Sequence, residues 1–298
     1  MVEPYLLDRM DEVLDAVEGF TGLAFSRQAG ASATIASLGD HMIGGHWGDV
    51  WFDSAGPPGL TANGDLAAIG LQKMSRPGRE WPLEHLCAPH LEESPDSVLR
   101  QLVAEELARV DGIDDPEMRL KAFKTDQWSF RWTLASMRAY QLAVPTLVPF
   151  YANDIVDFFL RVPAARLPGR RLQIAHLLRH HPDLARITWE QTGMPLDPYW
   201  WNYGLALTRR AAAKASRTLR RAPAIERNWE VQYMGGDLPG QLRRQIRKVS
   251  STSARLEHRQ TDRFVEDMIA APSAAHGYAA DCAITLHFAI SYASGATV

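Results

Sequence analysis

The sequence has few cysteines and no long hydrophobic run, and each shortage excludes a class of protein. Among its 298 residues only Cys87 and Cys282 are cysteines, which excludes a disulfide scaffold and a cysteine-rich zinc module and fits a reducing compartment. The longest apolar runs, such as 143–150, are far shorter than the roughly 20 residues of a membrane helix. The N-terminus lacks the basic and apolar segments of a signal peptide. We therefore expect a cytoplasmic globular protein that does not enter a membrane.

The chain also lacks a large excess of charge of either sign. Its 32 basic and 35 acidic residues give a net charge of −3, which shows no global attraction to nucleic acid or to a membrane. The segment 207–263 is nevertheless basic, with 14 lysines and arginines against 5 aspartates and glutamates. Its arginines could contact the phosphates of a nucleic acid over 209–248 or form a solvated helical face. Few aromatic residues lie between them, so the sequence favours the solvated face.

What the sequence does contain is helical periodicity. Apolar residues recur at spacings of three and four, which predicts a mainly α fold with one or two short strands. Ser97, the pair Asp115-Pro116, and Asn153 or Asp154 are the expected starts of three helices. Glycines and prolines predict a long irregular segment over 54–95 with at most short helices. The expected helices cover 6–17, 97–110, 115–142, 155–162, 172–180, 182–191, 204–221, 238–249, 261–271 and 279–292.

One glycine-rich segment carries the most chemical information. Residues 31–37 are typical of a short buried strand, and they run into the turn Gly39-Asp40-His41-Met42-Ile43-Gly44-Gly45. A buried strand that ends in such a turn places backbone N–H groups where a phosphate or a carboxylate can approach. The same arrangement also serves simply to reverse the chain, so the turn by itself does not define a function.

Three ordered blocks of the chain resemble the asparagine synthetase family. In the first block, Asp40, Gly44 and Gly45 match the family motif Ser-Gly-x-Gly-x-Asp-x-x-x-Gly-Gly-Tyr at a strand–turn–helix. The second block joins a helix at 124–131 to the turn at Pro149-Phe150 and to residues 160–163. The third block extends from 170 to 193. Together the blocks cover about residues 5–198.

The resemblance implies a fold and a domain division. It implies a mainly α domain similar to the C-terminal part of the adenine-nucleotide α-hydrolase-like synthetase domain. Residues 1–200 would form a partial asparagine synthetase-like region. Residues 201–298 would form a helical extension, basic in its first part, that packs on the same core.

The resemblance also implies ATP-dependent amide formation through an acyl-adenylate, with ATP and Mg²⁺ as cofactors and a small-molecule carboxylate as substrate. No protein ligands to a metal follow from it. The implied catalytic positions are Ser37, Asp40 and Gln191. The implied nucleotide-binding positions are Gly39, Asp40, Gly44, Gly45, Arg131 and Arg171, with Asn153 and Asp154 on the side of the arginines.

Several features of the family are missing from this chain. There is no pyrophosphate loop of the form Ser-Gly-Gly-x-Asp-Ser and no glutaminase domain. Ser37 stands where the family has an acidic residue, and Gln191 stands where a lysine would stabilise the adenylate. An amide cannot supply the positive charge of a lysine. We therefore expect the isolated chain to be inactive and to be completed by a partner that carries the missing half or a glutaminase.

Two alternatives from other functional classes remain open. The chain could be a non-catalytic, degenerate subunit that binds or regulates a split synthetase. It could also bind nucleic acid through the basic helices at 209–248, which we consider the weaker alternative.

The remaining polar candidates have simple structural interpretations. The spacing of His41, His46, Asp49 and Asp53 matches no helical pair of metal ligands, so we interpret them together with Asp40 as a polar loop. We interpret two histidines as surface loop residues and three as a solvated helix end. These are His85 and His90, and then His176, His180 and His181.

An aromatic group surrounds residue 200. Its members are Trp189, Tyr199, Trp200, Trp201 and Tyr203. Large aromatic side chains can anchor a ligand or a partner protein. Because burial in a core is the commoner role for such side chains, we expect this group to pack in the interior.

Overall fold

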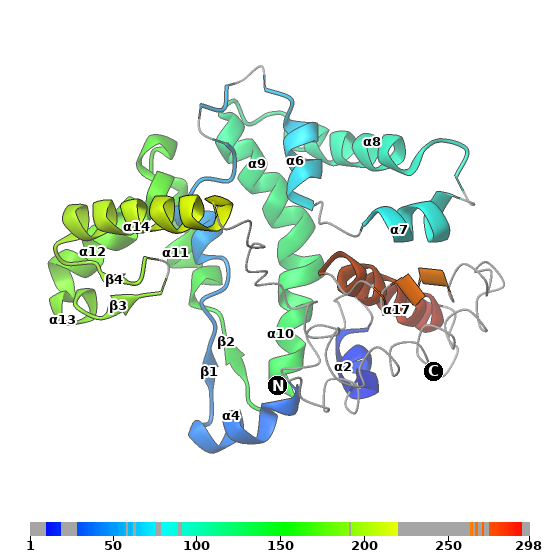
Figure 1. The fold of residues 1–298 in the computed structure, drawn as a ribbon, viewed down its shortest axis with the longest axis horizontal. Coiled ribbons are helices and arrows are strands. Elements are labelled where there is room, and N and C mark those ends of the chain that lie inside the picture. Colours follow the sequence, from blue (N-terminus) through cyan, green and yellow to red (C-terminus); the bar gives the residue numbers. More distant parts are fainter. Residues whose placement is uncertain are drawn as a thin grey trace. The chain divides into compact units, whose positions relative to one another are not determined.

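The computed structural model is mainly helical, as the sequence predicts. It describes residues 10–18, 29–57, 59–61, 64–74, 79–88, 91–190, 192–219, 263–264, 266–267, 270 and 274–293. Within this part the strands are four two-residue segments (Figure 1). No helix in the described ranges combines the length and the apolar character needed to cross a membrane.

The chain divides into two compact units, each built from separate stretches of sequence. Unit 1 contains Met1–His46, Gly56–Pro149 and Arg227–Val298, and unit 2 contains Trp47–Ala55 and Phe150–Glu226. The sequence predicts instead a boundary at residue 200 between two consecutive segments. That boundary stays a prediction.

Unit 1 contains a long helix, which the sequence predicts over 115–142. It consists of α9 (Pro116–Lys124), the π-helical stretch η4 (Thr125–Thr133) and α10 (Leu134–Gln141). The Asp115 side chain accepts a hydrogen bond of 3.0 Å from the Met118 N–H, and Pro116 occupies the first helical position. This cap confirms the predicted start, because an aspartate satisfies a helical N–H that otherwise has no partner.

The long helix buries one lysine among its apolar residues. The side chain of Lys121 is 1% exposed, and its Nζ lies 3.7 Å from Oε1 of Glu117. The other oxygen of Glu117 accepts a hydrogen bond of 2.8 Å from the Gly56 N–H. The carboxylate therefore links the loop at residue 56 to the long helix while it neutralises the buried charge.

Shorter helices surround the long helix in unit 1. Helix α2 (Met10–Val17) packs on α10 through the fully buried Val13 and Val17, and α6 (Leu66–Met74) packs on α8 (Pro95–Ala108). The helix α8 begins after Ser94, whose Oγ accepts from the Ser97 N–H at 3.3 Å. The predicted cap at Ser97 is therefore wrong, because Pro95 already occupies the first helical position.

The residues that the structure describes within 54–95 form only short helices, as the glycines and prolines of this segment predict. Besides α6 these are α7 (Glu80–Pro82) and the π-helical η2 (Leu83–Cys87). The last helix of unit 1 is α17 (Ala274–Ala293), which packs on α7 and contains the predicted helix 279–292. The predicted helix 238–249 lies outside the described residues, and those described within 261–271 are helical.

The predicted strand at 31–37 is wrong. This segment forms helix α4 (Ser32–Leu38). Strand β1 (Met42–Ile43) follows it and lies within the glycine-rich segment. Strand β1 pairs in parallel with β2 (Thr146–Leu147). Only Ser32 is buried in α4, so the run of small residues does not form the buried strand that its composition suggests.

Unit 2 is built around a cluster of aromatic rings. Its centre is Trp51 of α5 (Gly48–Phe52), whose ring centroid lies 4.6 Å from that of Phe159 in α11 (Asn153–Leu160). The Trp51 indole N–H donates to the Phe150 carbonyl at 2.8 Å. A Cβ at Gly48 would lie 2.7 Å from the Phe150 ring, so only glycine permits this approach. No side chain caps α11, and the predicted caps Asn153 and Asp154 are its first two residues.

The second half of unit 2 departs from the prediction at one hairpin. Helix α12 (Arg171–His180) was predicted, but the expected helix 182–191 ends early, as α13 (Pro182–Ala185). The antiparallel strands β3 (Thr188–Trp189) and β4 (Met194–Pro195) follow, and Gly193 has a positive φ of 68° in their connection. Helix α14 (Tyr199–Leu219) then begins five residues before the predicted 204.

Some members of the aromatic group around residue 200 are packed in the interior and others are exposed. Tyr199 and Trp189 pack against the buried residues Ile174, Ala185 and Leu196. In contrast, Trp200 is 78% exposed and Trp201 is 70% exposed. The expectation of core packing is therefore wrong for these two tryptophans.

Candidate functional site

The glycine-rich segment does not have the geometry that the resemblance implies. The Ser37 hydroxyl donates to the Thr34 carbonyl at 2.7 Å within α4. The N–H groups of Met42 and Gly44 donate to the carbonyls of Pro145 and Leu147, at 3.0 and 2.8 Å. These two N–H groups hold the β1–β2 ladder, so they are not directed at a phosphate.

The other implied positions do not assemble within one unit. Gly39, Asp40 and Gly45 are exposed on unit 1, and Arg131 is an exposed residue of η4 in the same unit. Arg171, Asn153 and Asp154 are exposed residues of unit 2, at the starts of α12 and α11. Gln191 lies outside the described residues. The implied positions are therefore divided between the two units, and the nucleotide site stays a prediction.

The candidate metal-binding loop is divided in the same way. His41 and His46 belong to unit 1, whereas Asp49 and Asp53 belong to unit 2. Asp53 accepts hydrogen bonds from the Gly169 N–H at 2.9 Å and from Arg170 Nε at 3.2 Å. Across the part of the chain that the structure describes, no three His, Cys, Asp or Glu side chains are grouped to hold a metal ion. Asp53 thus has a structural role, in the contact with Gly169 and Arg170.

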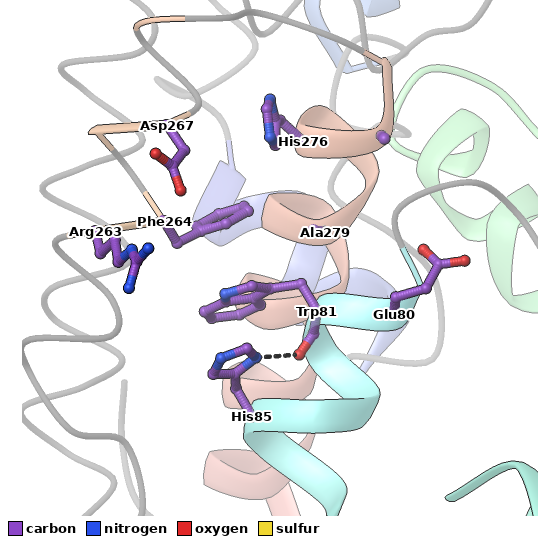
Figure 2. A pocket seen from close by; sticks show the side chains of 9 residues that line it. Glu80, Trp81, His85, Arg263, Phe264, Asp267, His276 and Ala279 are labelled. Atoms are coloured by element: carbon purple, nitrogen blue, oxygen red, sulfur yellow. Dashed lines mark hydrogen bonds between the residues drawn. The ribbon is translucent and has the colours of Figure 1, made fainter.

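A different site stands out in unit 1. A pocket of about 550 Å³ lies where α7 and η2 meet α17 and the segment 263–267. Its volume is within the range of small-molecule sites, which is roughly 300–1,000 Å³. Figure 2 shows the side chains around it, with Trp81, His85 and Phe264 stacked and the Glu80 carboxylate turned away from the rings. The residues that line the pocket are Glu80, Trp81, His85, Arg263, Phe264, Asp267, Ala275, His276 and Ala279.

A stack of rings forms the apolar wall of the pocket. The Trp81 ring lies between those of His85 and Phe264, with centroid distances of 5.0 and 4.3 Å and interplanar angles of 16° and 29° (Figure 2). The His276 ring meets Phe264 edge-on at 6.0 Å. Phe264 is 5% exposed, so it anchors its segment to unit 1. Offset stacking of this kind holds the rings in fixed positions before any ligand arrives.

The hydrogen bond of His85 defines its tautomer. Its Nδ1 lies 3.0 Å from the Trp81 carbonyl oxygen, one helical turn earlier (Figure 2). Because a carbonyl oxygen can only accept, Nδ1 carries the proton, and in the neutral ring Nε2 is then the acceptor nitrogen. The half-buried imidazole is thus oriented along the ring stack.

Charged side chains surround this apolar wall. Arg263 and Asp267 are one helical turn apart and exposed, and Glu80 lies on the other side of the ring stack (Figure 2). Within the described residues, neither Arg263 nor Asp267 has an ion-pair partner within 4.0 Å. The pocket therefore combines an aromatic wall with charges that a ligand can meet, which is the usual composition of a ligand site.

The expected location of His85 is wrong, and the pocket was not predicted from the sequence. His85 was expected in a surface loop, but it is a half-buried residue of η2, and His90 lies outside the described residues. The spacing of Trp81 and His85, four apart on a helix, is a signal that could have shown their stacking. Phe264 on the apolar face of the predicted helix 261–271 is the second such signal.

Comparison of the chain with protein-family models, with curated proteins and with solved structures finds no match. The ligand class is therefore inferred from the side chains of the pocket and their geometry.

Proposed function

We propose that this protein binds a small organic carboxylate with a planar apolar body in the pocket of unit 1. The observation that carries this proposal is Arg263, a guanidinium without an ion-pair partner among the described residues, beside the stack of Trp81 and Phe264. A guanidinium binds a carboxylate through two parallel hydrogen bonds. The rings meanwhile provide apolar surface for a flat ligand body.

One carboxylate of the pocket restricts which anions fit. Asp267 lines the pocket four residues after Arg263, so a ligand with several negative charges meets repulsion beside the guanidinium. A single carboxylate next to Arg263 avoids this cost, and an additional amine on the ligand would pair with Asp267. The site therefore favours a monocarboxylate over a polyphosphate.

This proposal corresponds to the non-catalytic binding subunit among the functions considered from sequence. The small-molecule carboxylate is also the substrate class that the resemblance to the asparagine synthetase family implies. The ATP and Mg²⁺ that it implies do not fit the glycine-rich segment, because the N–H groups of Met42 and Gly44 hold the β1–β2 ladder. We therefore derive no ATP-dependent step for this chain.

Calorimetric titration of the full chain tests the proposal. The probes are indole-3-acetate, its neutral analogue indole-3-acetamide, and ATP. We expect indole-3-acetate to bind at least about tenfold more tightly than the amide, because a hydrogen bond to a charged group contributes about 1.5–3 kcal/mol. The variant Arg263→Gln should remove this difference, whereas Arg209→Gln, an exposed arginine of α14, should leave it unchanged.

Two further results decide the proposal. Trp81→Leu should weaken both indole probes equally, because it removes the ring stack and keeps Arg263, and circular dichroism of the variant checks that the fold is retained. Equal affinity for acid and amide, tighter binding of ATP, or no binding of any probe at millimolar concentration would show that the pocket does not recognise carboxylates.

A further inference from the structure

Helix α14 of unit 2 has one face packed and the opposite face open. Asn202 and Ala206, four residues apart, are 8% and 2% exposed and face the unit. The Asn202 amide donates to the carbonyls of Pro195 and Asp197 at 3.0 and 3.2 Å, and α14 packs on β4. This buried pair fixes which side of the helix faces solvent.

The open face of α14 is apolar. Trp200 and Trp201 stand at its N-terminal end with exposures of 78% and 70%, and Leu205 and Leu207 follow with 38% and 47%. Small residues continue the face along the helix at spacings of four, three and four. They are Gly204, Thr208, Ala211 and Ala215, all exposed. We call this set, from Trp200 to Ala215, the open face.

Basic side chains flank the open face on both edges. Arg210 and Lys214 follow Leu207 at helical spacing along one edge, and Arg209 follows Leu205 along the other. All three are exposed, and α14 contains no acidic residue. Among the described residues, none of the three has a carboxylate within 4.0 Å. The helix therefore presents an apolar face between positive edges that no described carboxylate pairs with.

We propose that the open face of α14 binds an amphipathic partner helix whose apolar stripe is flanked by acidic side chains. The charge of both edges selects acidic flanks, because opposite charges beside an apolar contact determine which helices pair. Trp200 and Trp201 are the anchors of the contact, since tryptophan is the residue type that most often dominates binding energy. This proposal concerns unit 2 and is independent of the pocket.

The small residues distinguish a helix from other occupants. Gly204, Thr208, Ala211 and Ala215 allow the axis of a second helix to approach closely. They would bury little apolar surface in a lipid layer, where bulky side chains along the whole face are needed. A second copy of α14 would bring positive edges together, and like charges across helices are unfavourable.

Binding of designed helical peptides to the full chain tests the proposal. One peptide has the length of α14, a leucine and alanine stripe, and glutamate flanks, and its twin carries lysines instead. We expect fluorescence anisotropy to show binding of the glutamate peptide and at least about tenfold weaker binding of the lysine twin. The double variant Arg210→Glu/Lys214→Glu should reverse this preference.

The apolar part of the contact needs its own control. Trp201→Ala should weaken the glutamate peptide by about tenfold or more, whereas Leu184→Ala, an exposed apolar residue of α13, should leave it unchanged. Equal affinity for the two peptides, or binding of neither, would overturn the proposal. So would binding of phosphatidylglycerol vesicles that the glutamate peptide does not displace, or dimerisation of the chain that Trp201→Ala abolishes in sedimentation.

Discussion

At the scale of single residues, Asp53 stabilises the turn at Gly169 and Arg170, which was not predicted from the sequence. Gly169 and Arg170 both have a positive φ, of 73° and 56°, and Asp53 accepts hydrogen bonds from the N–H of the first and Nε of the second. A left-handed arginine carries backbone strain that its surroundings must offset. The carboxylate is therefore a structural part of unit 2.

The contribution of Asp53 can be measured by substitution. We expect Asp53→Ala to lower the free energy of unfolding by about 1–2 kcal/mol, because it removes two hydrogen bonds that each contribute about 0.5–1.5 kcal/mol. The measurement is urea denaturation followed by circular dichroism. Asp157→Ala, which changes an exposed carboxylate of α11, serves as the control and should stay within about 0.5 kcal/mol of the parent. Identical midpoints for both variants would contradict this role.

At the scale of elements, patterns of sequence predicted helices well where a cap accompanied the periodicity. The long helix at 116–141 is the clearest case, because Asp115 and Pro116 specify its start independently of its apolar residues. The segment 31–37 had no such second signal, and a short run of small residues fits a helix as well as a strand. The hairpin of β3 and β4 overlaps the predicted helix 182–191, because strands of two residues are too short to show the alternation that indicates a strand.

Helices α6 and α8 are joined by one carboxylate, and this connection should depend on pH. Asp65 accepts from the Ala68 N–H at 2.9 Å and pairs with Arg100 of α8. The hydrogen bond from the Ala68 backbone, followed by that from Arg100, lowers the pKa of Asp65 below its ordinary value. A lowered pKa in the folded state means that the carboxylate stabilises the fold at neutral pH, and that this contribution disappears as pH falls through the lowered pKa.

Comparing Asp65→Asn with the parent tests this dependence. We expect the parent to be more stable at neutral pH, because asparagine loses the ion pair with Arg100. The difference should stay constant down to the ordinary carboxylate range and then shrink as acid protonates Asp65. Urea denaturation at a series of pH values measures it, with Asp114→Asn, an exposed carboxylate, as the control. A difference that does not change with pH would exclude the charge of Asp65 as its cause.

At the scale of the whole molecule, the candidate pocket could not be predicted because it joins distant parts of the chain. Trp81 and Phe264 stack at 4.3 Å although 183 positions separate them in the sequence. Helical periodicity predicts which face of each segment is apolar, but it does not tell which segments meet. The mainly α class followed from local signals, whereas the site depends on this one long-range contact.

Removing the last part of the chain should affect unit 1 selectively. A protein that ends at residue 262 lacks Phe264 and α17, so α7 loses the helix on which it packs and Trp81 loses one ring of its stack. We expect hydrogen exchange, followed by mass spectrometry, to become faster in peptides from 79–88. Peptides from α14 in unit 2 should exchange as in the full chain. Unchanged protection at 79–88 would mean that the stack of Trp81 and Phe264 does not hold these helices.

The interleaving of the two units also sets an order for synthesis on the ribosome. Both stretches of unit 2, Trp47–Ala55 and Phe150–Glu226, are translated before residue 263, so unit 2 can form while the last stretch of unit 1 is still being made. Until Phe264 has been translated, it cannot cover the ring of Trp81. In a cell, the nascent chain thus exposes an apolar surface until residue 264 has been translated, which is the period when a chaperone would bind it.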